Sequence, residues 1–101
     1  MLYEQKNYDH LVGMKGFGDV ALKNHFTLYG GYVKNVNTII ESIKTLKANS
    51  PEYNELKRRF GWEWDGMRMH EFYFGGLTKE SKGIDTKSKL SKEIEKTFGS
   101  Y

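Results

Sequence analysis

The 101-residue sequence contains no cysteine. Disulfides, thiolate metal sites and cysteine nucleophiles are therefore excluded, and a reducing, cytoplasmic setting is expected. No stretch approaches the roughly 18 consecutive apolar residues that a membrane span requires, so no membrane partner is expected. The N-terminal sequence MLYEQKNYDH has no apolar core of the kind found in secretory signals, and we expect none.

A strong excess of charge is also missing, since the formal net charge is only +3. The C-terminal lysines alternate with acidic residues, which is typical of a solvated face, and no nucleic-acid partner is expected. The mild positive charge supports a weak attraction for small anions. With 38% hydrophobic and 15% aromatic residues, the composition is that of one small folded domain.

The first 18 residues predict an irregular lead-in, because Gly13, Gly16 and Gly18 interrupt any periodicity. His10 has no partner pattern and is interpreted as an exposed loop residue. Four apolar or aromatic residues could attach this segment to a core: Tyr3, Tyr8, Leu11 and Phe17.

A long helix is predicted from Gly18 or Asp19 to about Ala48. Gly30 and Gly31 each cost about 1 kcal/mol relative to Ala inside a helix, which suggests close approach by a neighbouring helix or another subunit. The predicted packing face recurs every three or four residues: Leu22, His25, Tyr29, Tyr32, Val36, Ile39, Ile40, Ile43 and Leu46.

A second helix is predicted to begin at Pro51, with Ser50 as its N-cap, and to end near Phe74 at Gly75-Gly76. Glu63 is expected to lie mostly off its packing face. That face comprises Tyr53, Leu56, Phe60, Trp64, Met67, His70, Phe74 and Leu77. Two such helices joined by a short turn form an antiparallel hairpin.

A polar linker over residues 78–87 is followed by a short third helix, which Gly99 ends after Phe98. The expected fold class is therefore all-α, a long hairpin plus a short helix. The expected organisation is a lead-in and hairpin over 1–77, the linker, and the start of a further, otherwise absent domain over 88–101.

The two helical histidines fall at matching levels of this hairpin. His25 lies about six residues inside the first helix and His70 about six residues before the end of the second, so both lie roughly 9 Å from the same end. Both occupy the packing face and should face each other. Two facing imidazoles can hold one metal ion, although histidines at such positions can also be ordinary packed residues.

The sequence resembles the iron/manganese superoxide dismutases at two motifs. One is His25 followed by Tyr32-Val33-x-Asn35-x-Asn37, and the other is His70-x-Phe72-Tyr73-x-x-x-Leu77. The stretch Leu90…Ile94…Phe98-Gly99-Ser100 is similar to the helix that opens the family's C-terminal domain. The resemblance implies the helical N-terminal domain of a fold that is α+β when complete.

The resemblance also implies site residues and an activity, the dismutation of superoxide anion to oxygen and hydrogen peroxide. His25 and His70 match two ligands of a manganese or iron ion, and Tyr32 matches the active-site tyrosine that relays protons through ordered water. The implied aromatic surroundings of the metal comprise Tyr29, Phe72, Tyr73 and Phe74.

Three features depart from the family pattern. Leu28 and Tyr29 stand where a histidine pair is common, with one residue fewer between the first ligand and Tyr32. Gly66, one turn before His70, resembles the manganese type. The Asp-x-Trp-x-x-His motif that completes the site is absent, so we expect the N-terminal half of such an enzyme, weakly active or inactive alone, with a complementary half or a homo-oligomer as partner.

Two other interpretations use the same residues. A helical interaction module descended from the family would bind no metal and would tolerate loss of His25 and His70. A di-iron bundle is disfavoured, because such sites need Glu-x-x-His and position 67 is methionine.

Overall fold

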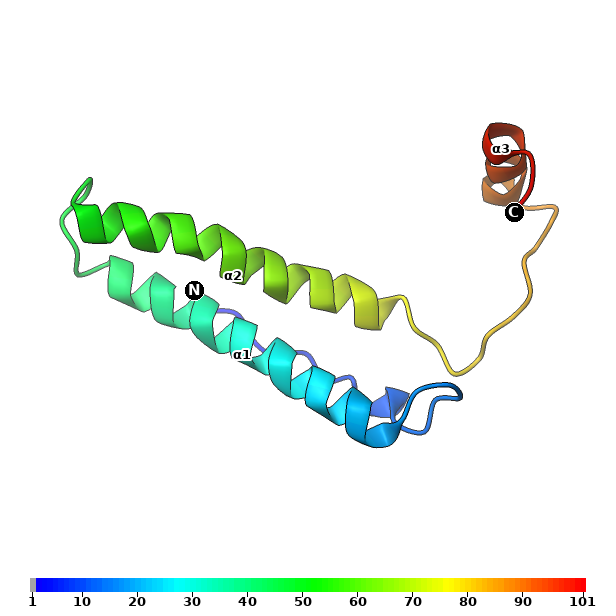
Figure 1. Ribbon diagram of the computed structural model, residues 1–101, viewed down its shortest axis with the longest axis horizontal. Helices are drawn as coiled ribbons and strands as arrows, with labels where there is room; N and C mark the ends of the chain where they lie inside the picture. The colour runs from blue at the N-terminus through cyan, green and yellow to red at the C-terminus, as the bar shows by residue number, and fades with distance from the viewer. Residues whose placement is uncertain (1) are drawn as a thin grey trace.

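The computed structural model describes residues 2–101, so Met1 lies outside the described part. It contains a 3-10 turn, η1 (Asp9–Leu11), and three helices, α1 (Asp19–Ile43), α2 (Pro51–Gly75) and α3 (Lys89–Phe98), with no strand among the described residues. Helices α1 and α2 lie side by side and antiparallel, and α3 stands apart from them (Figure 1). The prediction of an all-α chain built on a hairpin is confirmed.

The start of α2 follows the sequence signals closely. The Ser50 hydroxyl accepts a hydrogen bond from the Tyr53 backbone N–H at 3.2 Å, and Pro51 occupies the first turn. Proline suits this position because its missing N–H would have no helical partner there. At the other end the Gly76 N–H donates to the carbonyls of the last turn, and α2 ends within one residue of the prediction.

The predicted end of α1 at Ala48 is wrong, because the helix ends at Ile43. The N–H of Thr45 donates to the Ser42 carbonyl and that of Leu46 to the Ile43 carbonyl, so tight turns replace the helical pattern. Residues 44–50 are all used to reverse the chain, and Asn49 adopts a left-handed conformation with φ 64°. Leu46 therefore belongs to the turn and not to the α1 packing face.

The core lies between α1 and α2 and beneath the lead-in. Val33, which the three-four pattern omitted, belongs to it. Glu63 was expected off the packing face but is only 3% exposed. Its burial is possible because Arg59 donates to one carboxylate oxygen and Asn35 of α1 donates to the other. The buried cluster consists of Leu11, Tyr29, Val33, Val36, Met67 and Phe74.

Residues 2–8, here called the N-terminal arm, extend along the hairpin. The Tyr3 backbone both donates to and accepts from the Asn37 side chain, each at 2.8 Å. Gly30 gives room for the Gln5 side chain of this arm, whereas Gly31 faces open space. Within the chain, the close approach predicted at these glycines occurs at Gly30, and it comes from the lead-in instead of a neighbouring helix. His10 is exposed, as expected.

Helix α3 begins at the N-cap Ser88 and ends at Gly99, whose φ of 84° is left-handed. Its bounds agree with the prediction. Leu90 is 70% exposed and Phe98 is 77% exposed, so the apolar side of α3 has little to pack against.

Candidate metal centre

His25 and His70 meet near the open end of the hairpin, the end opposite the 44–50 turn. Their ring centroids lie 4.9 Å apart, with the ring planes inclined by 82°. Both side chains are half-buried and, together with Met69 and Tyr73, line an open hollow. The structure therefore brings the two predicted ligands together, and we refer to them below as the histidine pair.

The ring of His70 is oriented by its own helix. Its Nδ1 lies 2.6 Å from the Gly66 carbonyl oxygen. A carbonyl only accepts, so Nδ1 carries a proton and donates, and Nε2 is the ring nitrogen that can serve as a metal ligand in the neutral imidazole. The tautomer is assigned from this contact.

The surroundings of His25 disfavour its charged form. Burial, and then the neighbouring His70, lower the pKa of His25 below its ordinary value. Its ring nitrogens form no hydrogen bond to the described part of the chain. A neutral imidazole without a protein partner is the form that binds metal.

The spacing of the pair fits a shared ion. An imidazole bound at about 2.1 Å keeps its ring centroid roughly 3.2 Å from a metal, so two ligands at about 100° have centroids about 5 Å apart. The observed 4.9 Å agrees with that value. Among residues 2–101, however, no group of three or more His, Cys, Asp or Glu side chains could hold an ion. The donor set here is thus two imidazoles.

Aromatic rings surround the pair unequally. Phe74 is almost fully buried, and its ring lies 4.8 Å from that of His25 and 6.0 Å from that of His70. Tyr73 lies 5.2 Å from His25, and the Tyr29 ring stacks parallel to His70 at 6.4 Å. The structure does not bring Phe72 to the pair, because two residues after His70 a helical side chain points to the other side. It is 70% exposed.

Tyr32 also lies at the pair. Its ring centroid is 5.2 Å from that of His70. The ring rests on the backbone of α2 at Gly66, where a Cβ would come within 2.4 Å of it. Leu28, one turn earlier, is 54% exposed and lies outside the core.

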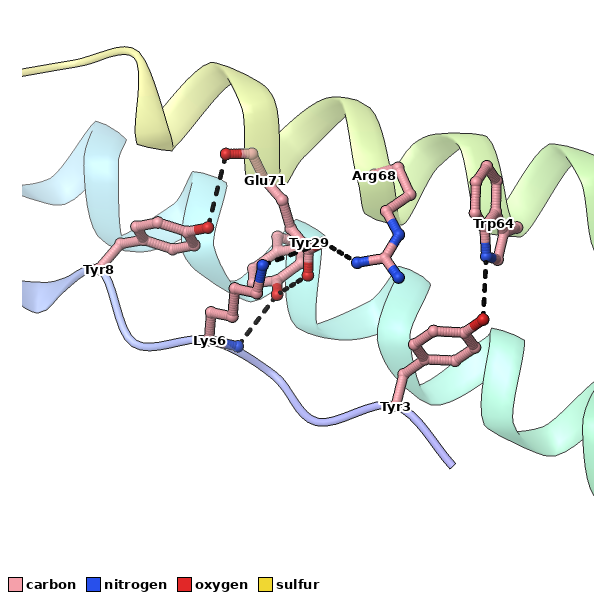
Figure 2. Close-up of polar contacts among 7 residues, drawn as sticks. All are labelled: Tyr3, Lys6, Tyr8, Tyr29, Trp64, Arg68 and Glu71. Atoms are coloured by element: carbon pink, nitrogen blue, oxygen red, sulfur yellow. Dashed lines mark hydrogen bonds and ion pairs between the residues drawn. The ribbon is translucent and has the colours of Figure 1, made fainter. Parts of the chain in front are cut away.

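A buried carboxylate that the sequence did not reveal lies next to His70 in the chain. Glu71 is 7% exposed. Its Oε2 accepts a 2.7 Å hydrogen bond from the Tyr29 hydroxyl, and its Oε1 lies 2.6 Å from Arg68 Nη1 and 3.7 Å from Lys6 Nζ. The Lys6 backbone N–H donates in turn to the Tyr29 hydroxyl at 3.0 Å (Figure 2).

The arm and α2 are joined at two further points in this region. The Tyr8 hydroxyl donates to the Glu71 backbone carbonyl at 3.5 Å, and the Trp64 indole N–H donates to the Tyr3 hydroxyl at 3.4 Å (Figure 2). The Arg68 guanidinium lies over the rings of both Tyr3 and Trp64. Contacts of this kind hold the arm against the hairpin.

The electrostatics of this cluster favour a neutral tyrosine and a charged carboxylate. Burial, with help from Glu71, raises the pKa of Tyr29 to about 12. Burial alone would raise the pKa of Glu71, but hydrogen bonds from Tyr29 and Arg68 and the charge of Lys6 outweigh it and lower that pKa. Glu71 is thus fully occupied by protein partners and does not act as a third ligand.

No pattern in the sequence indicated these contacts. Arg68 and Glu71 are three residues apart, a spacing that usually marks a solvated ion pair on a helix surface. The burial of Glu71 depends on Tyr29 and Lys6, which come from distant segments. A tyrosine on the packing face of α1 was the only available signal that a polar partner would be needed opposite it.

Within residues 2–101, none of the helices combines the length and the apolar character needed to traverse a bilayer.

No family model matches the chain, and no solved structure matches it. Two curated proteins match the chain. One is named superoxide dismutase [Fe], from Aquifex pyrophilus, and is 33% identical over 90% of this chain and 47% of its own length.

The other, also named superoxide dismutase [Fe], from Aquifex aeolicus, is 32% identical over the same shares of the two proteins. The chain spans about half the length of the curated relatives it matches. The similarity covers nearly all of the chain, and the helical hairpin agrees with the N-terminal domain of these enzymes. The chain is therefore a relative of the iron/manganese superoxide dismutases.

Proposed function

We propose that this chain supplies the N-terminal half of a superoxide dismutase, with His25 and His70 as two ligands of a redox-active metal ion and Tyr32 beside them. The observation that carries the proposal is the facing histidine pair, with rings 4.9 Å apart and the His70 ring oriented by the Gly66 carbonyl. The similarity to two enzymes named superoxide dismutase [Fe] supports it.

The metal ion, when bound, would supply a one-electron couple that oxidises one superoxide and reduces the next, which takes up two protons to form hydrogen peroxide. The chain's own residues orient the site. The Gly66 carbonyl fixes the His70 ring, and Phe74 excludes water from one side of both imidazoles. The phenol of Tyr32 is available near His70 to hold ordered solvent for proton delivery.

We propose iron as the metal. Both relatives carry iron in their names, which outweighs the resemblance of Gly66 to the manganese type. Imidazole ligands accept either ion, so the histidine pair itself does not discriminate.

The remaining ligands would come from outside this copy of residues 2–101, because two imidazoles bind a metal weakly and do not set its redox potential. We propose that residues 2–77 form the hairpin domain, that 78–87 link it to a second domain, and that 88–101 begin that domain. A complementary half, or a second copy in a homo-oligomer, would complete the site. The exposed Met69 and Tyr73, which line the hollow at the pair, are consistent with a covering partner.

The decisive experiment measures iron and manganese per chain after gel filtration, with superoxide dismutation assayed on the same fractions. The full chain is tested alone and mixed with the C-terminal half of the Aquifex pyrophilus enzyme. Because two imidazoles bind an ion only weakly, we expect metal that is retained through gel filtration, and activity, only in the mixture, and we expect both to be lost in His25→Ala and His70→Ala. His10→Ala is the matched control, since His10 is an exposed histidine that is not part of the pair. Equal metal content in all three variants would contradict the proposal.

A second candidate, a non-catalytic helical interaction module, is favoured by one observation: the described residues alone offer only two metal-ligating side chains at the site. It predicts a metal-free, inactive chain in a defined oligomer or complex. Under this alternative, His25→Ala and His70→Ala would leave partner binding unchanged.

A further inference from the structure

The hydrogen bond between Tyr29 and Glu71 joins α1 to α2 close to the histidine pair. Tyr29 lies one turn after His25, and Glu71 directly follows His70. The Tyr29 hydroxyl and the Glu71 carboxylate are 2.7 Å apart, and both side chains are almost fully buried. This bond therefore links the helices at the level where the two imidazoles meet.

A bond of this kind constrains position more than apolar packing does. Apolar contacts are non-directional, whereas a buried donor and a buried acceptor must stay within hydrogen-bonding distance or remain unsatisfied. A shift of α1 along α2 would break the Tyr29–Glu71 bond. The same shift would separate His25 from His70.

We propose that Tyr29 and Glu71 are positioning residues, whose buried hydrogen bond sets how closely His25 and His70 approach each other. This inference rests on the proposed function, because it concerns the same two imidazoles. Neither residue is a ligand. They act through the placement of the helices that carry the ligands.

The N-terminal arm completes this arrangement. The Lys6 backbone N–H donates to the Tyr29 hydroxyl at 3.0 Å, so the hydroxyl accepts one hydrogen bond and donates another in a fixed direction. Lys6 Nζ and Arg68 provide positive charge at the other carboxylate oxygen of Glu71. The arm, α1 and α2 thus all meet at the buried Tyr29 hydroxyl and Glu71 carboxylate (Figure 2).

The chain contains a matched control for this bond. Asn35 of α1 donates to the buried carboxylate of Glu63 in α2 at 3.2 Å, so it too joins the two helices through a buried glutamate. Asn35 lies ten residues from His25, about 15 Å along the helix. Its removal should loosen the hairpin far from the pair.

The test uses the full-length, metal-free chain and two measurements. The first is the nuclear Overhauser effect between ring protons of His25 and His70, whose rings lie 4.9 Å apart. The second is the affinity for Co²⁺ alone, measured by titration of its visible absorption. In Tyr29→Phe and Glu71→Leu we expect the Overhauser effect to weaken and Co²⁺ affinity to fall about tenfold, toward that of His70→Ala. Glu71→Gln keeps an acceptor for Tyr29 and should restore both readouts.

Asn35→Ala should change the Overhauser effect and the Co²⁺ affinity by less than about twofold. An unchanged Overhauser effect in both Tyr29→Phe and Glu71→Leu would overturn the inference, as would an equal loss in Asn35→Ala, which would indicate general loosening. If the unmutated chain bound no Co²⁺, the proposed metal site would fail. The Overhauser effect would still decide the positioning role, because it requires no metal.

Discussion

The ring of Tyr32 lies on the α2 backbone at Gly66, where a Cβ would stand 2.4 Å from the ring carbons Cδ1 and Cε1. The carbonyl oxygen of the same glycine lies 2.6 Å from His70 Nδ1. Gly66 therefore places two candidate site residues at once, one through its missing side chain and the other through its backbone.

Substitution of Gly66 by alanine should destabilise the protein and displace Tyr32. Alanine gains about 1 kcal/mol over glycine in a helix interior. The clash with an aromatic ring near its attachment point should cost more, since overpacking typically costs about 1–3 kcal/mol. We expect a net loss of up to about 2 kcal/mol in the free energy of unfolding, measured by urea denaturation, and a changed Tyr32 ring environment in NMR spectra.

Gly61→Ala is the matched control in the same helix, because no atom lies within 4 Å of a Cβ placed there. It should stabilise the protein by up to about 1 kcal/mol. If both alanine variants were equally stabilising, the contact between Tyr32 and Gly66 would be disproved.

Features set by neighbouring residues along the chain were predictable from the sequence. The bounds of α2 follow from Ser50, Pro51 and the glycines after Phe74, because capping and proline geometry involve only a few consecutive residues. The end of α3 at Gly99 follows in the same way. The level match of His25 and His70 was predictable too, since it requires only the rise per residue and one turn.

Features set by partners distant in the sequence were not predictable. Glu63 and Glu71 are buried because side chains from α1 and the arm satisfy them, and no local pattern shows those partners. The path of the arm depends on Asn37 and on the space at Gly30. The end of α1 at Ile43 is set by the length of chain needed to reverse direction before Ser50.

The two adjacent glycines of α1 should respond differently to alanine. Gly31→Ala meets nothing within 4 Å and should stabilise the protein by up to about 1 kcal/mol. Gly30→Ala must displace the Gln5 amide, which lies within 2.7 Å of the new Cβ, so its gain should be smaller. In a Gln5→Ala background the two substitutions should become equivalent. A Gly30→Ala gain independent of Gln5 would mean that the arm is not packed at this position in solution.

The stability of the arm should depend on acidic pH through Glu71. Folding lowers the pKa of the Glu71 carboxyl below its ordinary value of 4.5. The stabilisation of the folded state by this carboxylate is therefore complete above pH 4.5 and is lost as the pH falls through the lower pKa of the folded protein. Glu71→Gln should cost about 1–3 kcal/mol at neutral pH and less in acid. Urea midpoints of the two proteins, measured between pH 7 and pH 3, should therefore converge. Parallel curves would show that the Glu71 carboxylate is not selectively stabilised by folding.

The N-cap of α2 should make a measurable contribution to stability. The Ser50 hydroxyl accepts the Tyr53 N–H at 3.2 Å, and removal of such a cap costs about 1 kcal/mol. Ser50→Ala should therefore lower the free energy of unfolding by about that amount, as measured by urea denaturation. Ser81→Ala, in the exposed linker, is the control and should have no effect. Equal results for the two variants would show that the cap is not formed.

Helix α3 should exchange its amide hydrogens much faster than α1 and α2 when the chain is studied alone. It has only ten residues, Leu90 and Phe98 are largely exposed, and it stands apart from the hairpin. Helices shorter than about 12–15 residues are marginal in water without tertiary packing, so its caps at Ser88 and Gly99 should not protect it for long.

Hydrogen exchange followed by mass spectrometry should show near-complete labelling of α3 while the residues around Val36 and Met67 remain protected. Strong protection of α3 in the isolated chain would mean that its apolar side is already covered, either by the hairpin or by a second copy, and measurements at two protein concentrations would separate these cases.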